Sequence, residues 1–349
     1  MFAKEGLNQL FQAQRKTFER VARIGDHLQK RFHDMQDPIN GLLLAAVTGE
    51  AILLVGPPGT GKSRLIRSLC NLLGLLPDEI LRGQAGKDER SGEYFEYLLT
   101  QFTEPSELFG FFDIVKLNKQ SVLERKQDGM MQQAQVVFLD EVFNASSAIL
   151  NSLLTFMNER RFHDRGEAVE TRLQLLVSAT NHTPTEPHLA AVYDRFLLRS
   201  RLNNVAHPGL RQEPLTRLLQ AAWTESFAPE IKAAEKDTKL LGDLVLYRKA
   251  VSEMTAAGRL VIDPNHPVLS KLTALVGSMV KFELSEMSNR RLVKMIGVVL
   301  AARMLRAARA GETAIDIEPR DLNIIMEYSI DRSDPSGEAK LRQELEMRP

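Results

Sequence analysis

One short stretch constrains this chain more than any other. Residues 51–64 read AILLVGPPGTGKSR, so an apolar run leads into a glycine-rich turn that ends in lysine and serine. The spacing G-x-x-x-x-G-K-[ST] is typical of a loop that surrounds phosphate groups. Glycine permits backbone angles that other residues avoid, so several N–H groups can face one anion, and the N-terminal end of the next helix adds positive potential. The residues predicted to form this phosphate loop are Gly56, Pro57, Pro58, Gly59, Thr60, Gly61, Lys62 and Ser63.

The sequence on both sides of the loop supports this interpretation. Ala51–Val55 predicts a buried strand, and Leu65–Leu73 predicts a helix that ends at Gly74. A chance glycine-rich loop would not need a strand before it and a helix after it. In a loop of this kind, Lys62 reaches the β- and γ-phosphates of a nucleotide, and the Ser63 hydroxyl is a magnesium ligand.

Composition limits the class of protein. At 349 residues the chain is long enough for two domains. Lys plus Arg and Asp plus Glu both number 45, so no bulk charge favours nucleic acid or a membrane surface. The sequence has one cysteine, Cys70, which we expect in the core, and one cysteine forms no internal disulfide. We therefore expect a reducing, cytoplasmic location, and no apolar run reaches the length of a membrane-spanning helix.

The first part of the chain predicts an α/β domain. Residues 7–34 have the apolar spacing of one amphipathic helix, and a shorter helix is expected over Asn40–Val47. Up to about residue 204, apolar strands then alternate with helices, which is typical of a parallel sheet covered by helices on both faces. Besides Ala51–Val55, the expected strands are Tyr94–Phe102, Val136–Leu139, Leu173–Ala179 and Phe196–Leu198.

After about residue 205 the strand signals fade and helices predominate. We therefore expect an α/β fold in which a phosphate-loop domain with a central parallel sheet is followed by a smaller all-helical domain. The expected division is 1–37 (N-terminal helix), 38–205 (αβα nucleotide-binding domain), 206–331 (all-helical domain) and 332–349 (charged tail, either frayed or helical). The expected helices are Leu210–Thr224, Thr238–Ala257, His266–Phe282, Asn289–Ala310 and one that begins near Glu318-Pro319.

Two acidic residues follow the strand predicted over Val136–Leu139. Asp140 and Glu141 would lie at the carboxyl end of that strand, where ligands of parallel sheets gather. An aspartate there can hold magnesium, and the adjacent glutamate can orient or deprotonate a water that attacks the γ-phosphate. The plainer interpretation is a helix cap, but the phosphate loop upstream favours the functional one.

Three further polar residues complete a candidate site. Asn181 follows the strand that ends LLVSAT, where its amide could orient the attacking water, although a turn residue would also fit. Arg195 and Arg290 could stabilise charge that develops on a phosphoryl group. Taken alone, either arginine is more typical of a surface salt bridge.

In this order, the segments resemble those of an AAA+ ATPase of the MoxR family, most closely its RavA-like branch. The resemblance covers roughly residues 35–330 and implies a phosphate-loop domain followed by an all-helical lid. The segments that carry it are GPPGTGKS (56–63), FEYLLTQFTEPSELFG (95–110), VVFLDEVFNASSAILNSLLTFMNERRF (136–162), LLVSATN (175–181), YDRFLLR (193–199) and SNRR (288–291).

The resemblance implies a role for each candidate residue. Gly56–Ser63 match Walker A, and Asp140 and Glu141 match Walker B as the magnesium aspartate and the catalytic glutamate. Asn181 matches sensor 1. Arg195 matches the arginine finger that acts on the neighbouring subunit's nucleotide, with Arg199 as a weaker rival. Arg290 matches sensor 2 of the lid, with Arg291 as the near rival. ATP, Mg²⁺ and a homo-oligomeric, hexameric ring are therefore implied.

Two more segments fit the same family. Leu108–Gln135 matches an insert that projects toward the central pore. Its apolar residues Phe109, Phe111, Phe112 and Ile114 fit an apolar pore element and core packing equally well. Arg160–Arg172 predicts a hairpin around Arg165-Gly166. The role of Pro77–Gly92 is left open between a surface loop, a partner contact and a gate.

The leading functional hypothesis is an ATP-hydrolysing ring that remodels or matures a partner protein complex, as a MoxR-type chaperone with a von Willebrand factor A (vWA) domain partner. The alternative is a nucleic-acid-associated motor or a defence-system ATPase subunit, favoured by Lys119, Arg125 and Lys126 but opposed by the neutral charge balance. A scaffold that binds ATP without turnover is a third hypothesis, and the complete set of candidate residues argues against it. A kinase or GTPase remains formally open, although no guanine-selective N-K-x-D motif is present.

Overall fold

The computed structural model describes residues 1–81, 92–121, 123–164, 167–202, 216, 219–220, 223, 235–331 and 334–346. Contacts divide the chain into two compact units. The α/β unit contains Ile24–Phe196 and Ser200–Leu241, and the helical unit contains Met1–Arg23, Leu197–Arg199 and Gly242–Pro349. The four-part division expected from the sequence stays a prediction.

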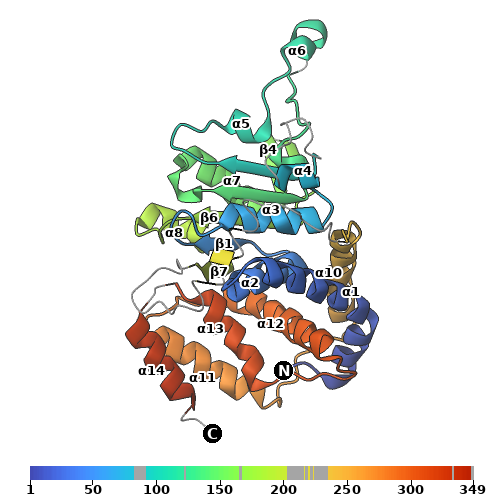
Figure 1. The fold of residues 1–349 in the computed structure, drawn as a ribbon, viewed down its shortest axis with the longest axis vertical. Helices are drawn as coiled ribbons and strands as arrows, with labels where there is room; N and C mark the ends of the chain where they lie inside the picture. The colour runs from blue at the N-terminus through green and yellow to red at the C-terminus, as the bar shows by residue number, and fades with distance from the viewer. Residues whose placement is uncertain are drawn as a thin grey trace. The chain divides into compact units, whose positions relative to one another are not determined.

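The α/β unit contains a five-stranded sheet with the strand order β2-β3-β6-β1-β7, except that Leu198 and Arg199 of β7 are grouped with the helical unit (Figure 1). The pairs β2–β3, β3–β6 and β6–β1 are parallel, as the alternation of strands and helices predicts. Strand β2 ends earlier than expected because the chain turns at Thr100–Thr103, and β7 begins later than expected. The strands are β1 (Ile52–Val55), β2 (Tyr94–Leu98), β3 (Val136–Asp140), β6 (Leu175–Thr180) and β7 (Leu198–Arg201).

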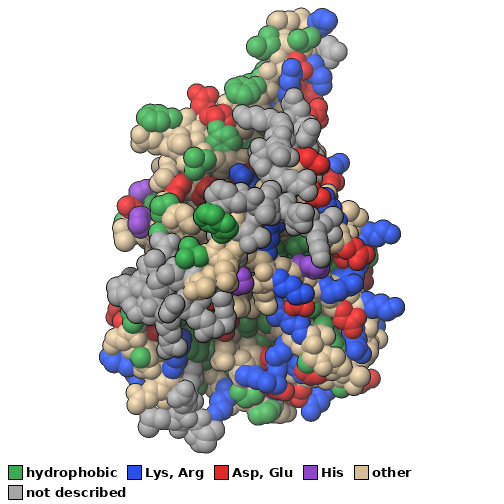
Figure 2. All heavy atoms as spheres, in the orientation of Figure 1, with side chains coloured by type: hydrophobic (Ala, Val, Ile, Leu, Met, Phe, Trp, Pro, Cys, Tyr) green, Lys and Arg blue, Asp and Glu red, His purple; other side chains and the backbone are tan. Residues whose placement is uncertain are grey.

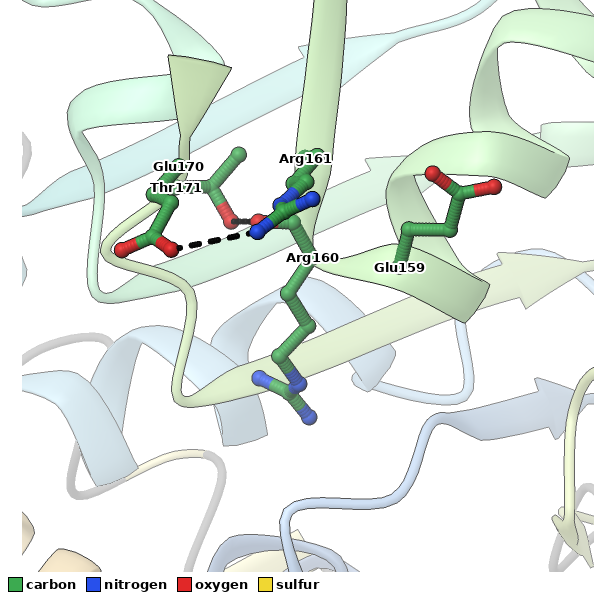
Figure 3. A pocket seen from close by; sticks show the side chains of 5 residues that line it. All are labelled: Glu159, Arg160, Arg161, Glu170 and Thr171. Carbon is green, nitrogen blue, oxygen red and sulfur yellow. Dashed lines mark hydrogen bonds and ion pairs between the residues drawn. The ribbon is translucent and has the colours of Figure 1, made fainter. Parts of the chain in front are cut away.

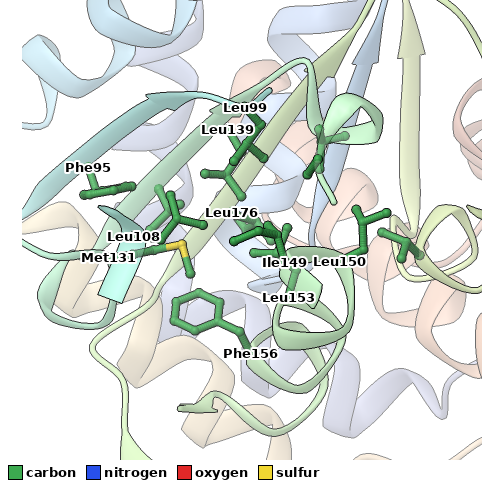
Figure 4. Close-up of a cluster of buried hydrophobic side chains, with 14 of the residues drawn as sticks. Phe95, Leu99, Leu108, Met131, Leu139, Ile149, Leu150, Leu153, Phe156 and Leu176 are labelled. Atoms are coloured by element: carbon green, nitrogen blue, oxygen red, sulfur yellow. The ribbon is translucent and has the colours of Figure 1, made fainter. Parts of the chain in front are cut away.

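Helices cover both faces of this sheet, which confirms the expected layers. On one face, α5 (Pro105–Phe109) and α7 (Ser147–Glu159) pack against apolar residues of β1, β2, β3 and β6 in one buried cluster (Figure 4). Elsewhere, α2 (Gln36–Thr48) packs against β1 and β6, and α3 (Lys62–Leu72) packs against β3. Helix α2 begins before the expected Asn40 because Pro38 lies in its first turn, where a missing N–H costs little.

A separate antiparallel hairpin follows α7. Strands β4 (Arg161–Asp164) and β5 (Glu167–Glu170) pair from Arg161–Glu170 to Asp164–Glu167. The hairpin expected over Arg160–Arg172 is therefore confirmed, while its turn at Arg165-Gly166 lies outside the described residues.

Short helices complete the α/β unit. In Pro77–Gly92 the described part forms α4, and residues 82–91 lie outside the described residues. The elements are α4 (Asp78–Leu81), α6 (Ile114–Gln120), α8 (Ala190–Tyr193) and the 3-10 turns η2 (Met131–Gln133), η3 (Val142–Asn144) and η4 (Pro187–Leu189).

The helical unit contains the long helices expected in the second half of the chain. Helix α12 has the predicted bounds, whereas Leu210–Thr224 lies almost entirely outside the described residues. The charged tail forms a helix, α14, whose Leu341 is buried. The elements are α10 (Leu240–Ala256), α11 (Val268–Lys281), α12 (Asn289–Ala310), η5 (Pro319–Leu322), α13 (Asn323–Ser329) and α14 (Pro335–Glu346).

The N-terminal helix α1 (Lys4–Arg31) is shared between the two units, with the change after Arg23. Its Phe18 packs edge to face against Tyr247 of α10, with ring centroids 5.1 Å apart. Among the described residues, no helix has both the length and the apolar character needed to cross a bilayer.

We predict that Phe156→Ala lowers the free energy of unfolding by about 3–5 kcal/mol, because it leaves a cavity in the cluster of Figure 4. The Phe156 side chain is fully buried, and its ring lies 6.4 Å from that of Phe109. The matched control is Phe102→Ala, because Phe102 is 81 % exposed and its truncation should change the stability by less than about 0.5 kcal/mol. Urea unfolding followed by circular dichroism measures both, and equal losses would contradict the placement of Phe156.

Candidate nucleotide-binding site

The candidate site lies where three neighbouring strands of the α/β unit end. In the parallel register Val55 of β1 faces Thr180 of β6, and Leu139 of β3 faces Ser178 of β6. The Gly56 N–H donates to the Thr180 carbonyl at 3.0 Å and so fixes the start of the phosphate loop against β6. The loop, the acidic pair and Asn181 therefore emerge from adjacent strand ends.

The phosphate loop needs its glycines for two different reasons. Gly59 and Gly61 have φ of +81° and +82°, in the left-handed region that side chains with a Cβ rarely adopt. Gly56 instead permits a close approach, because a Cβ there would lie 2.5 Å from the Leu202 carbonyl oxygen. A Cβ at Gly59 would meet nothing within 4 Å, so this part of the loop is open.

Lys62 is folded into the loop that it closes. Only 7 % of the residue is exposed, and its ammonium donates to the carbonyls of Gly56 and Pro57, the latter at 3.2 Å. Burial lowers the pKa of Lys62, and the nearby charges of Asp140 and Glu141 partly offset this change. A buried ammonium whose hydrogen bonds go to neutral oxygens fits an anionic ligand. The N-terminus of α3, with no side-chain cap among the described residues, fits the same ligand.

The acidic pair ends β3 in a constrained conformation. The Asp140 carboxylate accepts the Glu141 N–H at 3.0 Å. Glu141 has φ of +53°, a region that costs a residue with a Cβ about 1–3 kcal/mol. Such strain is common at functional positions, and here it falls on the residue that the sequence selects as the candidate general base.

Asn181 lies against the phosphate loop. Its side-chain oxygen accepts from the Lys62 ammonium at 3.4 Å, a long contact that still joins the end of β6 to the loop. Lys62, Asp140, Glu141 and Asn181 therefore form one group, joined by this contact, by the Asp140–Glu141 hydrogen bond and by the Coulombic effect on Lys62.

Arg195 is placed in the α/β unit, but no described hydrogen bond joins it to that group. Its guanidinium lies 3.9 Å from the Asp194 carboxylate, and about a quarter of the side chain is exposed. Within the described part of the chain, its buried Nε has no hydrogen-bond partner.

The candidate arginines of the helical unit differ in exposure and in their ion pairs. Arg290 is exposed in the first turn of α12. Its rival Arg291 is 2 % exposed and forms an ion pair with Asp331 at 2.9 Å. Arg199, the rival of Arg195, is 4 % exposed and also forms an ion pair with Asp331. The two rivals are thus held in one buried cluster, whereas Arg290 faces solvent.

The structure adds residues near the loop that sequence reasoning missed. The Met35 methyl would lie 3.7 Å from a Cβ at Gly61, so the segment between α1 and α2 approaches the phosphate loop. Burial lowers the pKa of Arg64, and the nearby positive charge of Arg31 lowers it further. No motif marks these residues, and only the folded chain brings them together.

The apolar residues of the insert, Leu108–Gln135, are divided between the core and the surface. Phe109 is 1 % exposed and stacks on Phe162 with centroids 4.2 Å apart, so it belongs to the core. Phe111, Phe112 and Ile114 are exposed. They lie on residues 111–126, which we call the arm; it projects from the α/β unit and ends in α6 (Figure 1). Hydrophobic and basic side chains lie next to each other at its tip (Figure 2).

A small open pocket lies at the base of the β4–β5 hairpin, away from the candidate site (Figure 3). Its charged groups already have protein partners. Arg161 pairs with Glu170 at 3.5 Å, and Arg160 extends away from the pocket to the carbonyls of Gly49 and Leu173. These contacts therefore attach the hairpin to the α/β unit. The pocket is separate from the group of Lys62, Asp140, Glu141 and Asn181.

Comparison with solved structures supports the fold. The chain matches the crystal structure of a protein from Cytophaga hutchinsonii described as a "putative ATPase", with a TM-score of 0.61 and 16 % identity over 97 % of this chain and 94 % of the other. The parallel sheet flanked by helices and the helical unit define an α/β AAA+ fold with a helical lid.

The family follows from the sequence comparison. Residues 19–245 match the family bpMoxR, the MoxR domain in the MoxR-vWA-beta-propeller ternary systems. The match covers more than half of the chain, which therefore belongs to this family of MoxR-type AAA+ ATPases.

Curated relatives add little about activity. Two uncharacterized proteins of Methanocaldococcus jannaschii are 32 % and 33 % identical over 68 % and 63 % of this chain. A structural protein of Acidianus two-tailed virus is 29 % identical over 66 % of the chain. The chain spans 60 %, 52 % and 34 % of the lengths of these three proteins.

Proposed function

We propose that this chain hydrolyses ATP to ADP and phosphate and, as a ring, uses that reaction to remodel or mature a partner protein complex that contains a vWA domain. The observation that carries the proposal is the group of Lys62, Asp140, Glu141 and Asn181 at adjacent strand ends, in a chain of the bpMoxR family. The RavA-like branch and the cytoplasmic location stay predictions.

Each residue of the group has a distinct task in this proposal. The loop N–H groups and Lys62 bind the phosphates, and Lys62 exchanges its carbonyl partners for phosphate oxygens. The Ser63 hydroxyl and the Asp140 carboxylate are the groups that would hold Mg²⁺, which when bound neutralises charge on the phosphates. Glu141 accepts the proton of the attacking water, and Asn181 orients that water without adding charge.

Arg195 and Arg290 supply positive charge to the phosphoryl group. Arg195 is partly exposed, and its ion pair with Asp194 is long at 3.9 Å, which suits a guanidinium that reaches the nucleotide of a neighbouring subunit. Such a site is complete only when subunits assemble, so we propose a homo-oligomeric, hexameric ring. Arg290, exposed at the start of α12, acts as the lid arginine.

The surface of the arm favours a protein partner. Ile114 is 67 % exposed, and Phe111 and Val115 are more than half exposed, so the arm offers large apolar side chains to another protein. Two of its basic residues already have partners within the arm, because Lys116 forms an ion pair with Glu124 at 2.7 Å and the Arg125 guanidinium lies over the Phe112 ring. This mixture suits a protein surface better than a nucleic-acid backbone. The vWA partner is inferred from the systems that define the family.

The first prediction tests ATP hydrolysis itself. Glu141→Gln keeps the size of the side chain but removes the proton acceptor, so we expect turnover to fall by about 10²–10⁴-fold while ATP still binds. Phosphate release and the affinity for a fluorescent ATP analogue measure the two properties. The control is Glu159→Gln, which makes the same change at the end of α7, outside the candidate group. Turnover near the wild-type value in Glu141→Gln would refute the assignment of Glu141.

The second prediction tests the ring. Arg195→Ala and Glu141→Gln chains should each be nearly inactive alone and regain turnover when mixed, because an Arg195→Ala subunit keeps Glu141 and receives the arginine of a Glu141→Gln neighbour. Turnover is measured across a series of mixing ratios, with mass photometry to follow assembly. A mixture as inactive as its two components would show that Arg195 does not act between subunits.

The third prediction tests the protein partner. Glu141→Gln chains held in ATP should capture a protein with a vWA domain from native extract, identified by mass spectrometry. The same chains with Ile114→Ser and Val115→Ser should lose that capture. In the otherwise wild-type chain, these two changes should leave ATP turnover within about twofold, because both residues are exposed. Capture of nucleic acid instead, abolished by nuclease or high salt, would favour the nucleic-acid alternative.

A further inference from the structure

A single carboxylate of the helical unit gathers two buried arginines from distant parts of the chain. Asp331, two residues after the end of α13, accepts Arg291 of α12 at 2.9 and 3.1 Å and forms an ion pair with Arg199 of β7. All three residues belong to the helical unit. Both arginines are almost fully buried, so solvent contributes little to their neutralisation.

The remaining contacts of Asp331 fix its orientation. Its Oδ2 also accepts the Ser285 hydroxyl and the Glu286 N–H, both at 2.9 Å. Arg291 is held from its other side, because its Nη2 donates to the Ser329 carbonyl at 3.1 Å. The carboxylate therefore ties together the turn before α12, the first turn of α12 and β7.

The two arginines are close in the sequence to residues with proposed roles in ATP hydrolysis. Arg291 directly follows Arg290 at the start of α12, where Ser288 caps the helix by accepting the Arg291 N–H. Arg199 belongs to the short segment Leu197–Arg199, which follows Arg195 after one intervening residue, Phe196. The chain passes from the α/β unit to the helical unit after Phe196 and returns at Ser200.

We propose that Asp331 is a positioning residue for ATP hydrolysis. It holds the first turn of α12, and with it Arg290, at a fixed place relative to the segment that follows Arg195. This inference rests on the proposed function, because the task of Asp331 depends on the role proposed for Arg290.

A purely stabilising role predicts a different result from a positioning role. If Asp331 only stabilises the fold, its removal lowers the folded fraction and changes ATP binding and turnover together. If it positions Arg290, then in folded protein turnover falls while ATP affinity is largely kept, because this arginine acts on charge that develops during the reaction.

The test compares the full-length wild-type chain with Asp331→Asn and Asp331→Glu. We expect Asp331→Asn to lower kcat by about 10-fold and to change the Kd for a fluorescent ATP analogue by less than about threefold. Asp331→Glu keeps the charge and should restore most of the loss. The matched control is Glu327→Gln on α13, an exposed position where the same loss of charge should leave kcat unchanged. Circular dichroism and gel filtration establish that each variant is folded.

The outcomes separate this inference from the proposed function. Wild-type turnover together with unchanged kcat in folded Asp331→Asn overturns the positioning role alone. Absence of wild-type turnover under assembly conditions overturns the proposed function and this inference with it. If Asp331→Asn does not fold, Arg199→Lys is measured instead. This change keeps both charges of the ion pair with Asp331 but loses the planar guanidinium. Its kcat should fall at unchanged Kd, and an unchanged kcat would overturn the positioning role.

Discussion

The parallel register between β1 and β6 is the constraint on which the candidate site depends. One hydrogen bond, from the Gly56 N–H to the Thr180 carbonyl, sets where the phosphate loop leaves the sheet. Because β6 also pairs with β3, the same register places Asn181 and the acidic pair beside that loop. A shift of one residue in this pairing would separate Lys62 from Asn181 and would turn buried side chains of β6 to the opposite face of the sheet.

Burial and backbone conformation then determine the properties of the charged groups at the strand ends. Lys62 is buried near two carboxylates yet hydrogen-bonds neutral oxygens, so its charge is available to an anion without a strong ion pair having to break first. Glu141 is held in a strained backbone conformation by the start of η3. The sheet thus fixes the positions of these residues, while burial of Lys62 and backbone strain at Glu141 affect the groups that we propose to act on ATP.

Local patterns in the sequence predicted much of this, and long-range packing accounts for the rest. The phosphate loop, the strands around it and helix α12 follow from glycine spacing, apolar runs and helical periodicity, which are properties of neighbouring residues. The burial of Phe109 and the exposure of Phe111 could not be separated in this way, because both lie in one apolar segment. Asp331 and Met35 carry no local signal, since their contacts involve residues far along the chain.

The arm is closed at its base by local hydrogen bonds. Lys126 donates its N–H to the Phe111 carbonyl, Arg125 donates to the Gly110 carbonyl, and Gly110 permits the two segments to approach at a distance that a side chain would block. Helix α6 buries none of its described side chains. Change at its tip is therefore uncoupled from the core, so the exposed side chains of the tip can be substituted without disturbing the packing of the α/β unit.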